Sequence, residues 1–216
     1  MEEKQNIFER IKLYLFKPSE FFQKYKENPK YIFHLIILSI IACASALISK
    51  YVNASALNEL MNESMSNLSQ SQIEANNNAM GLVNSPIVTV LFALIGTVAG
   101  YYIVSAIYYL IIGKIFKGEG TFNQMMIVVL LSSYVVNIYQ LVKSFIPINY
   151  NIDSLSTISI TDTVNIFTIW QLVLMIIGTS VLFNISKKKS GIIFIVLFII
   201  STLFALRSVL FLNSVI

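Results

Sequence analysis

Residues 103–139 read IVSAIYYLIIGKIFKGEGTFNQMMIVVLLSSYVVNIY, two apolar segments joined by a short basic hinge. The hinge, residues 113–124, carries Lys114, Lys117 and Glu119. Neither these charges nor the open backbone groups of a turn can remain in hydrocarbon. The stretch therefore predicts two membrane-spanning helices that form an antiparallel pair, with the rest of the chain packed around them.

The composition of the whole chain is that of an integral membrane protein. Of its 216 residues, 56% are hydrophobic and only 12% are charged, and the mean hydropathy is +0.73. In soluble domains about a quarter of all residues are charged. Because a spanning helix needs roughly 20 apolar residues, we predict an all-α polytopic bundle of five transmembrane helices. These spans are residues 31–49, 87–112, 123–146, 163–186 and 190–212.

The chain is expected to divide into two parts, a cytoplasmic amphipathic segment over residues 1–30 and a five-helix transmembrane domain over residues 31–216. An external loop, residues 50–86, joins the first two spans. In the amino-terminal segment Ile7, Ile11 and Leu15 recur at helical spacing. That pattern fits an amphipathic helix in the inner membrane interface, or equally a soluble helix packed on the hinge.

The basic residues predict the orientation of the bundle. Twelve of the 15 lie before the first span, in the hinge or in the loop before the fifth span, and only Lys50, Lys143 and Arg207 lie elsewhere. Because cytoplasmic loops carry the excess of Lys and Arg, the amino terminus is predicted to be cytoplasmic and the carboxyl terminus external. The bias toward Ile, Asn and Lys favours a bacterial cytoplasmic membrane.

We define the basic end of the molecule by eight residues of that cytoplasmic set, and expect it to bind anionic lipid of the inner leaflet or a protein partner. The same distribution gives no case for nucleic-acid binding. The eight residues are Arg10, Lys12, Lys17, Lys114, Lys117, Lys187, Lys188 and Lys189.

A polar stripe runs along the third span, where Ser133, Asn137 and Gln140 share one helical face. Gln171, on the antiparallel fourth span, lies close to the depth of Asn137 and Gln140. We therefore predict hydrogen bonds between the third and fourth spans, each worth about 0.6–2 kcal/mol. A solute pathway along the same polar face is the alternative.

Small residues indicate where helices approach closely. Gly96 and Gly100 form a small-xxx-small step in the second span, and Gly178 lies in the fourth. Such steps let two backbones come together where lipid supplies no hydrophobic drive. We expect packing within the bundle, with a homo-oligomer seam as the alternative.

The chemistry available inside the predicted spans is narrow. They contain no Asp or Glu, which disfavours ion-coupled transport. One histidine, His34, and one cysteine, Cys43, provide neither a metal set nor a nucleophile with its base. We expect no enzyme, no cofactor and no metal site, with His34 acting as a hydrogen-bonding side chain near the inner interface.

Three stretches together resemble the Yip (Ypt-interacting protein) family of five-span membrane proteins, in its prokaryotic type. They are FKPSEFF at residues 16–22, GKIFKGEGTFNQ at residues 113–124 and NIFTIWQLVLMIIG at residues 165–178. The resemblance implies a cytoplasmic amino terminus, a short external carboxyl end and no enzymatic activity. The Asp-Leu-Tyr-Gly-Pro signature of eukaryotic members is absent before the first span, so binding of Rab-type GTPases is not implied.

The resemblance implies a non-enzymatic membrane adaptor or accessory protein. Some bacterial relatives look like partners of ABC-type exporters, and eukaryotic members are associated with membrane trafficking. The alternative function is an uncoupled channel or permease subunit that moves a small solute or lipid along the polar face of the third and fourth spans.

Overall fold

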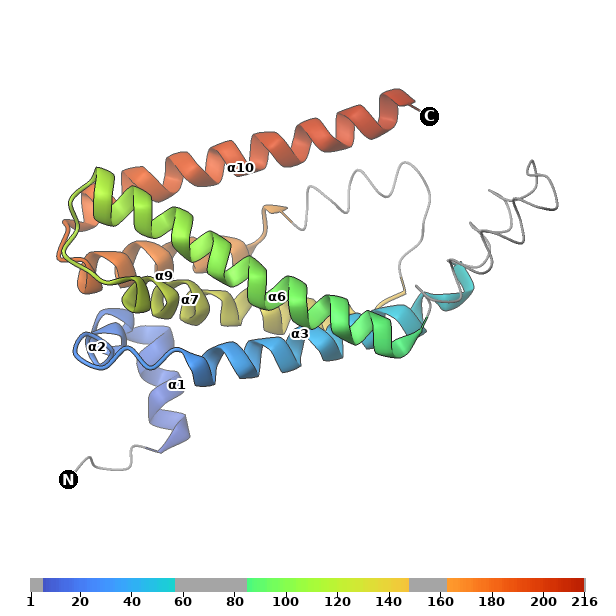
Figure 1. The fold of residues 1–216 in the computed structure, drawn as a ribbon, viewed down its shortest axis with the longest axis horizontal. Helices are drawn as coiled ribbons and strands as arrows, with labels where there is room; N and C mark the ends of the chain where they lie inside the picture. The colour runs from blue at the N-terminus through green and yellow to red at the C-terminus, as the bar shows by residue number, and fades with distance from the viewer. Residues whose placement is uncertain (1–5, 57–84, 148–162, 216) are drawn as a thin grey trace.

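The computed structural model describes residues 6–56, 85–147 and 163–215, which form a bundle of helices (Figure 1). Over these residues the protein is all-α, as the sequence predicts. The elements are α1 (Ile7–Phe16), α2 (Pro18–Gln23), α3 (Ile32–Val52), α6 (Pro86–Tyr109), the π-helical turn η1 (Leu110–Ile115), α7 (Phe122–Lys143), α9 (Ile166–Leu182) and α10 (Lys187–Val215).

Each of the five predicted spans coincides with a helix. Within the described ranges, α3, α6 together with η1, and α7 are long and apolar enough to cross a membrane. The fourth span is shorter than predicted, since α9 has 17 residues and ends at Leu182 rather than at residue 186. Asn184 then takes a positive φ of 54°, which ends the helix. The count of five crossings stays a prediction, as does the external loop, most of which lies outside the described residues.

The central element is α7 alone and not the α6–α7 pair that the hinge predicted. Residues 125–131 of α7 are at most 3% exposed, because α3, α6 and α9 surround this helix. In α6, by contrast, Ser105 is the only buried residue, and the outer face of the helix is apolar. A helix that is buried all round forms the core of the bundle, and α6 is one of its walls.

Two turns at the same end of the bundle are joined directly, and we call this contact the turn clamp. The Glu119 backbone N–H donates to the Phe183 carbonyl oxygen at 3.0 Å, and Asn184 Nδ2 donates to Glu119 Oε2 at 2.9 Å. The Phe183 ring is fully buried and lies directly on Gly118 and Gly120. The turn between η1 and α7 is thereby fixed to the turn between α9 and α10.

The hinge glycines are required for space rather than for a special backbone conformation. None of the described glycines has a positive φ, whereas Lys117 has a φ of 55°. A Cβ at Gly120 would lie 2.6 Å from the Phe183 ring. The missing side chains of Gly118 and Gly120 leave the space that the Phe183 ring fills.

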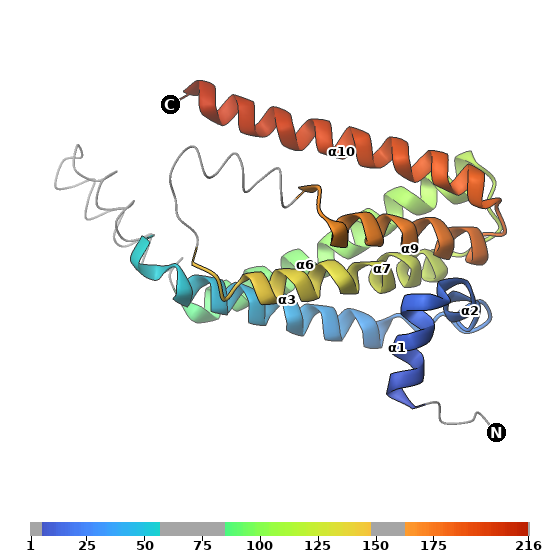
Figure 2. The ribbon, with the colours of Figure 1, turned by 180° about the vertical axis from the view of Figure 1, so that it is seen from behind.

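The amino-terminal helices pack on the half of the bundle that carries the turn clamp. Phe22 of α2 is fully buried, and its ring lies so close to Gly178 that a Cβ there would be 2.8 Å away. Gly178 therefore permits the close approach of α2 to α9. α1 lies crosswise to the helices of the bundle, and its amino-terminal end extends away from them (Figure 2). Near its other end the Tyr14 hydroxyl donates to the Leu131 carbonyl oxygen at 2.9 Å. Because Ile7 is 74% exposed, this placement favours an interfacial helix with its apolar face toward lipid.

The turn clamp predicts that Gly120→Ala destabilises the protein. The added Cβ would overlap the Phe183 ring, and overpacking of this kind costs about 1–3 kcal/mol. The measurement is the unfolding temperature of the full chain in detergent, which should fall by several degrees. Gly191→Ala is the matched control, because its Cβ would meet only Ile176 Cγ2 at 4.0 Å. Equal unfolding temperatures for the two variants would contradict the clamp.

Candidate functional site

A cavity of about 480 Å³ lies between α6, α7, α9 and α10. Its lining combines hydroxyl and amide groups with apolar side chains. The lining residues are Gly96, Thr97, Gly100, Tyr101, Val104, Tyr108, Val129, Ser133, Asn137, Thr163, Thr168, Gln171, Leu172, Met175, Phe194, Leu197, Phe198 and Ser201. Three of the four residues of the predicted polar cluster, Ser133, Asn137 and Gln171, line this cavity.

The predicted hydrogen bond between the third and fourth spans is present, but it joins Gln171 to Ser133. Gln171 Nε2 donates to Ser133 Oγ at 3.1 Å. The Ser133 hydroxyl in turn donates to the Val129 carbonyl oxygen at 2.8 Å. Ser133 thus has both its donor and its acceptor function satisfied, and it links α9 to α7.

Asn137 bonds in another direction, toward α6. Its Nδ2 donates to the Tyr101 hydroxyl at 2.9 Å and to the Ser133 carbonyl oxygen at 2.8 Å. Gln140 is half-buried and makes no side-chain hydrogen bond to another residue that the structure describes. The stripe therefore ties α7 to two neighbours, α6 and α9, through different residues one helical turn apart.

Gly96 and Gly100 have a different role from the one predicted. A Cβ at either position would meet no atom within 4 Å, so no described helix packs closely on this step. The expectation of close packing within the bundle at these glycines is wrong. Both glycines instead form part of the cavity wall and leave its α6 side open.

His34 joins the amino-terminal segment to the bundle. Its Nε2 lies 3.2 Å from the Tyr25 hydroxyl, and its Nδ1 lies 3.1 Å from the Tyr134 hydroxyl on α7. Burial raises the pKa of the Tyr25 phenol, so that hydroxyl keeps its proton. His34 acts here as a hydrogen-bonding side chain between three elements, and in the described ranges no group of His, Cys, Asp and Glu could hold a metal ion.

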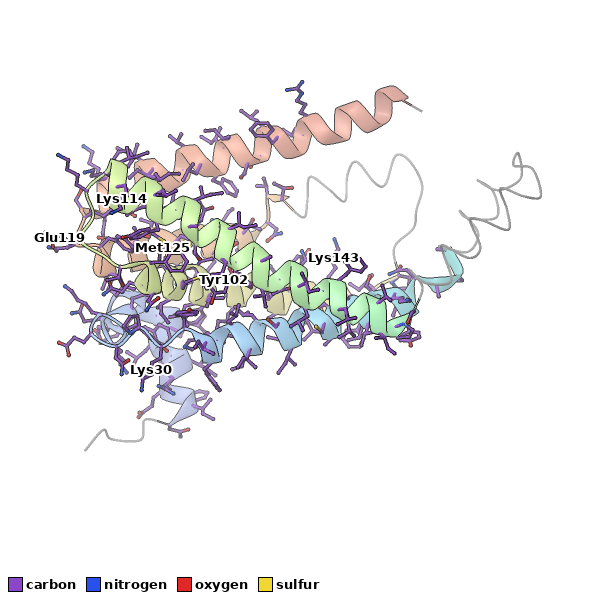
Figure 3. The ribbon with its side chains drawn as sticks, viewed as in Figure 1. Lys30, Tyr102, Lys114, Glu119, Met125 and Lys143 are labelled. Carbon is purple, nitrogen blue, oxygen red and sulfur yellow. The ribbon has the colours of Figure 1, made fainter. Side chains whose placement is uncertain are left out.

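The basic end gathers the lysines of the two clamped turns. Figure 3 shows Lys114 and Glu119 at the turn end of the bundle and Lys143 toward the opposite end. Lys189 Nζ donates to the Phe116 carbonyl oxygen at 3.0 Å and so bridges the two turns. Lys117 is exposed next to this contact.

The remaining members of the basic end are exposed on α10 and on the amino-terminal helices. Lys187 and Lys188 are exposed at the start of α10. On the amino-terminal helices, Lys17 pairs with Glu20 at 2.9 Å, and Arg10 and Lys12 are exposed on α1.

Several residues that build these sites carried no signal in the sequence. Phe183 and Asn184 form the turn clamp, yet each reads as an ordinary residue at the end of an apolar segment. Phe194 and Ser201 line the cavity from α10, a helix without a polar stripe. Tyr101 did carry a signal, because a tyrosine deep in a span needs a partner for its hydroxyl.

The fold and these sites define an integral membrane protein of the all-helical, multi-span class. The sequence model of the Yip1 domain matches residues 12–208, and the chain therefore belongs to the Yip1 family, as the three motifs suggested. It is 34% identical over 137 residues to "Membrane protein YknW" of Bacillus subtilis (strain 168), an alignment that covers 57% of this chain and 58% of that protein. The match thus spans less than two thirds of the relative. No solved structure matches the chain.

The hydrogen bond between Gln171 and Ser133 predicts energetic coupling between these two residues. In a double-mutant cycle with Ser133→Ala and Gln171→Leu, unfolding in detergent should show a coupling of about 0.5–2 kcal/mol. The matched control pairs Gln140→Leu with Gln171→Leu and should show coupling close to zero, since Gln140 makes no bond to Gln171. Equal coupling in both cycles would mean that the bond does not hold α7 to α9.

Proposed function

We propose that this member of the Yip1 family is a non-enzymatic membrane adaptor or accessory protein. Its basic end would hold a protein partner at the cytoplasmic surface, either an ABC-type exporter or a component of membrane trafficking or organisation. The observation that carries this proposal is the turn clamp, which fixes the lysines of two separate turns relative to one another. We place the protein in a bacterial cytoplasmic membrane with its amino terminus in the cytoplasm.

A fixed set of charges suits a docking surface. Lys114 and Lys117 come from the turn after α6, and Lys187 and Lys188 come from the turn before α10. The bond from Glu119 to Phe183 holds both turns in place, so little conformational entropy is lost when a partner binds. The Glu119 carboxylate accepts a hydrogen bond from Asn184. A partner with an acidic surface complements this end and is steered toward it.

Anionic lipid of the inner leaflet binds the same charges and strengthens this role. Juxtamembrane lysines are attracted to anionic headgroups by about 1 kcal/mol each. The apolar face of α1, with Ile7 and Phe8 each 74% exposed, can lie in the same interface. Lipid binding would thus orient the basic end, while partner choice depends on the arrangement of the lysines.

The cavity supports a second candidate, an uncoupled transport protein for a small solute or lipid. The polar part of its lining, at Ser133, Asn137 and Gln171, provides neutral hydrogen-bonding groups. Groups of this kind suit a solute path that is not coupled to ion transport. An adaptor requires no such path but does require a bound partner, whereas a transport protein can act alone. The two candidates therefore differ in whether a bound partner is needed.

Charge reversal at the basic end tests the adaptor proposal. The full chain carrying Lys187→Glu and Lys188→Glu should recover about tenfold less partner from native membranes in mild detergent than the unaltered chain. The control carries Lys187→Arg and Lys188→Arg, which keep the charge, and should recover the same amount of the same partner. Undiminished recovery with the reversed charges, or a chain that is captured alone in every variant, would contradict the proposal.

A further inference from the structure

We propose that the cavity between α6 and α10 binds one lipid of the outer leaflet, with an uncharged polar end that carries hydroxyl and ester groups. A diacylglycerol is the chemical class that fits. This inference goes beyond the adaptor role, which needs no ligand inside the bundle. It rests on the polarity, charge and opening of the cavity.

The polar groups of the cavity lie toward the external ends of the helices. Gln171 is five residues beyond the start of α9, and Asn137 is six residues before the end of α7. A helix rises 1.5 Å per residue, so the two amides lie about 7–9 Å inside their external ends. Both amides thus lie in the external halves of α7 and α9, on the side from which the glycerol and ester groups of an outer-leaflet lipid would reach them.

Toward the cytoplasm the cavity becomes apolar and then closes. Met175 lies one turn deeper on α9 than Gln171, and Val129 lies deeper on α7 than Asn137. The inner end is closed by Tyr108 of α6 against Phe194 of α10, whose ring centroids are 5.3 Å apart. The cavity is therefore polar outside and apolar inside, which is the direction in which an outer-leaflet lipid lies.

The lining favours an uncharged ligand that can donate hydrogen bonds. None of the lining residues is Asp, Glu, Lys, Arg or His, so an ionised headgroup would be desolvated without an opposite charge. Asn137 and Gln171 both use their amide nitrogens within the bundle, on Tyr101 and Ser133. Their carbonyl oxygens have no donor among the described residues, and each can accept from a ligand hydroxyl.

Two walls of the cavity, α6 and α10, diverge away from the turn end, and we infer that the cavity opens sideways between them. In Figure 1 the end of α6 lies next to the start of α10 at the turn end, and the two helices diverge toward their other ends. The α6 wall carries Gly96 and Gly100, which leave open space toward the cavity. A volume of about 480 Å³ falls within the range of roughly 300–1,000 Å³ for ligand pockets. An acyl chain can enter this space from the bilayer without crossing water.

A substitution that fills the cavity tests the proposal. The full chain is placed in nanodiscs of phosphatidylcholine with a diacylglycerol that carries a photoactivatable diazirine on one acyl chain. Crosslinks mapped by mass spectrometry should lie on cavity residues and be removed by excess unlabelled diacylglycerol. In Gly100→Leu they should fall about tenfold or more, because the new side chain occupies the open space. Ala99→Leu, on an exposed neighbour outside the lining, is the matched control and should keep them.

The outcomes distinguish a lipid site from general contact with the bilayer. Gly100→Leu should unfold within a few degrees of the unaltered chain, since its Cβ meets nothing within 4 Å, and Gly96→Leu should repeat the result. Crosslinks that persist in both filled variants, or that lie only on the outer faces of the helices, would overturn the proposal. Competition by phosphatidylglycerol that equals competition by diacylglycerol would overturn the assignment of an uncharged ligand.

Discussion

The structure depends on the hydrogen bond from the Glu119 backbone N–H to the Phe183 carbonyl oxygen. Turns between spanning helices leave backbone groups without partners, and these groups must find water or each other. Here two turns satisfy one another, and the buried Phe183 ring fills the space above Gly118 and Gly120. The α6–α7 hairpin and the α9–α10 hairpin are therefore held together at one end of the bundle.

Joining the hairpins at one end gives the two ends of the molecule different properties. At the clamped end the lysines of both turns lie close together, and Lys189 bridges the turns through the Phe116 carbonyl oxygen. Away from the clamp α6 and α10 diverge, while Gln171 and Ser133 tie α9 to α7 and Asn137 and Tyr101 tie α7 to α6. A rigid basic surface and a laterally open, uncharged cavity follow from the same contact. The proposed partner surface and the proposed lipid site thus lie at opposite ends of the bundle.

Hydropathy alone predicted all five helical segments. The polar stripe, together with Gln171, predicted three residues that line the cavity, Ser133, Asn137 and Gln171. Both signals depend only on the helical period and on depth along the helix. The choice of partners could not be predicted. Ser133 and Asn137 are one turn apart, and matching depths to within a turn cannot decide which of them meets Gln171. The role of each glycine could not be predicted either, because it depends on the neighbouring part of the structure. At Gly120 the missing side chain admits the Phe183 ring, whereas Gly100 borders the cavity.

The central claim is that the clamped, basic end faces the cytoplasm and that the cavity opens toward the outer leaflet. Membrane-topology reporters test it most directly. Reporters placed after residue 5, within residues 113–124 and at Lys188 should be cytoplasmic, and reporters near Asn76, Ser156 and Ile216 should be external. A cytoplasmic carboxyl terminus would require an even number of crossings, and an external reporter at Lys188 would place the basic end on the wrong side. Either result would contradict the account.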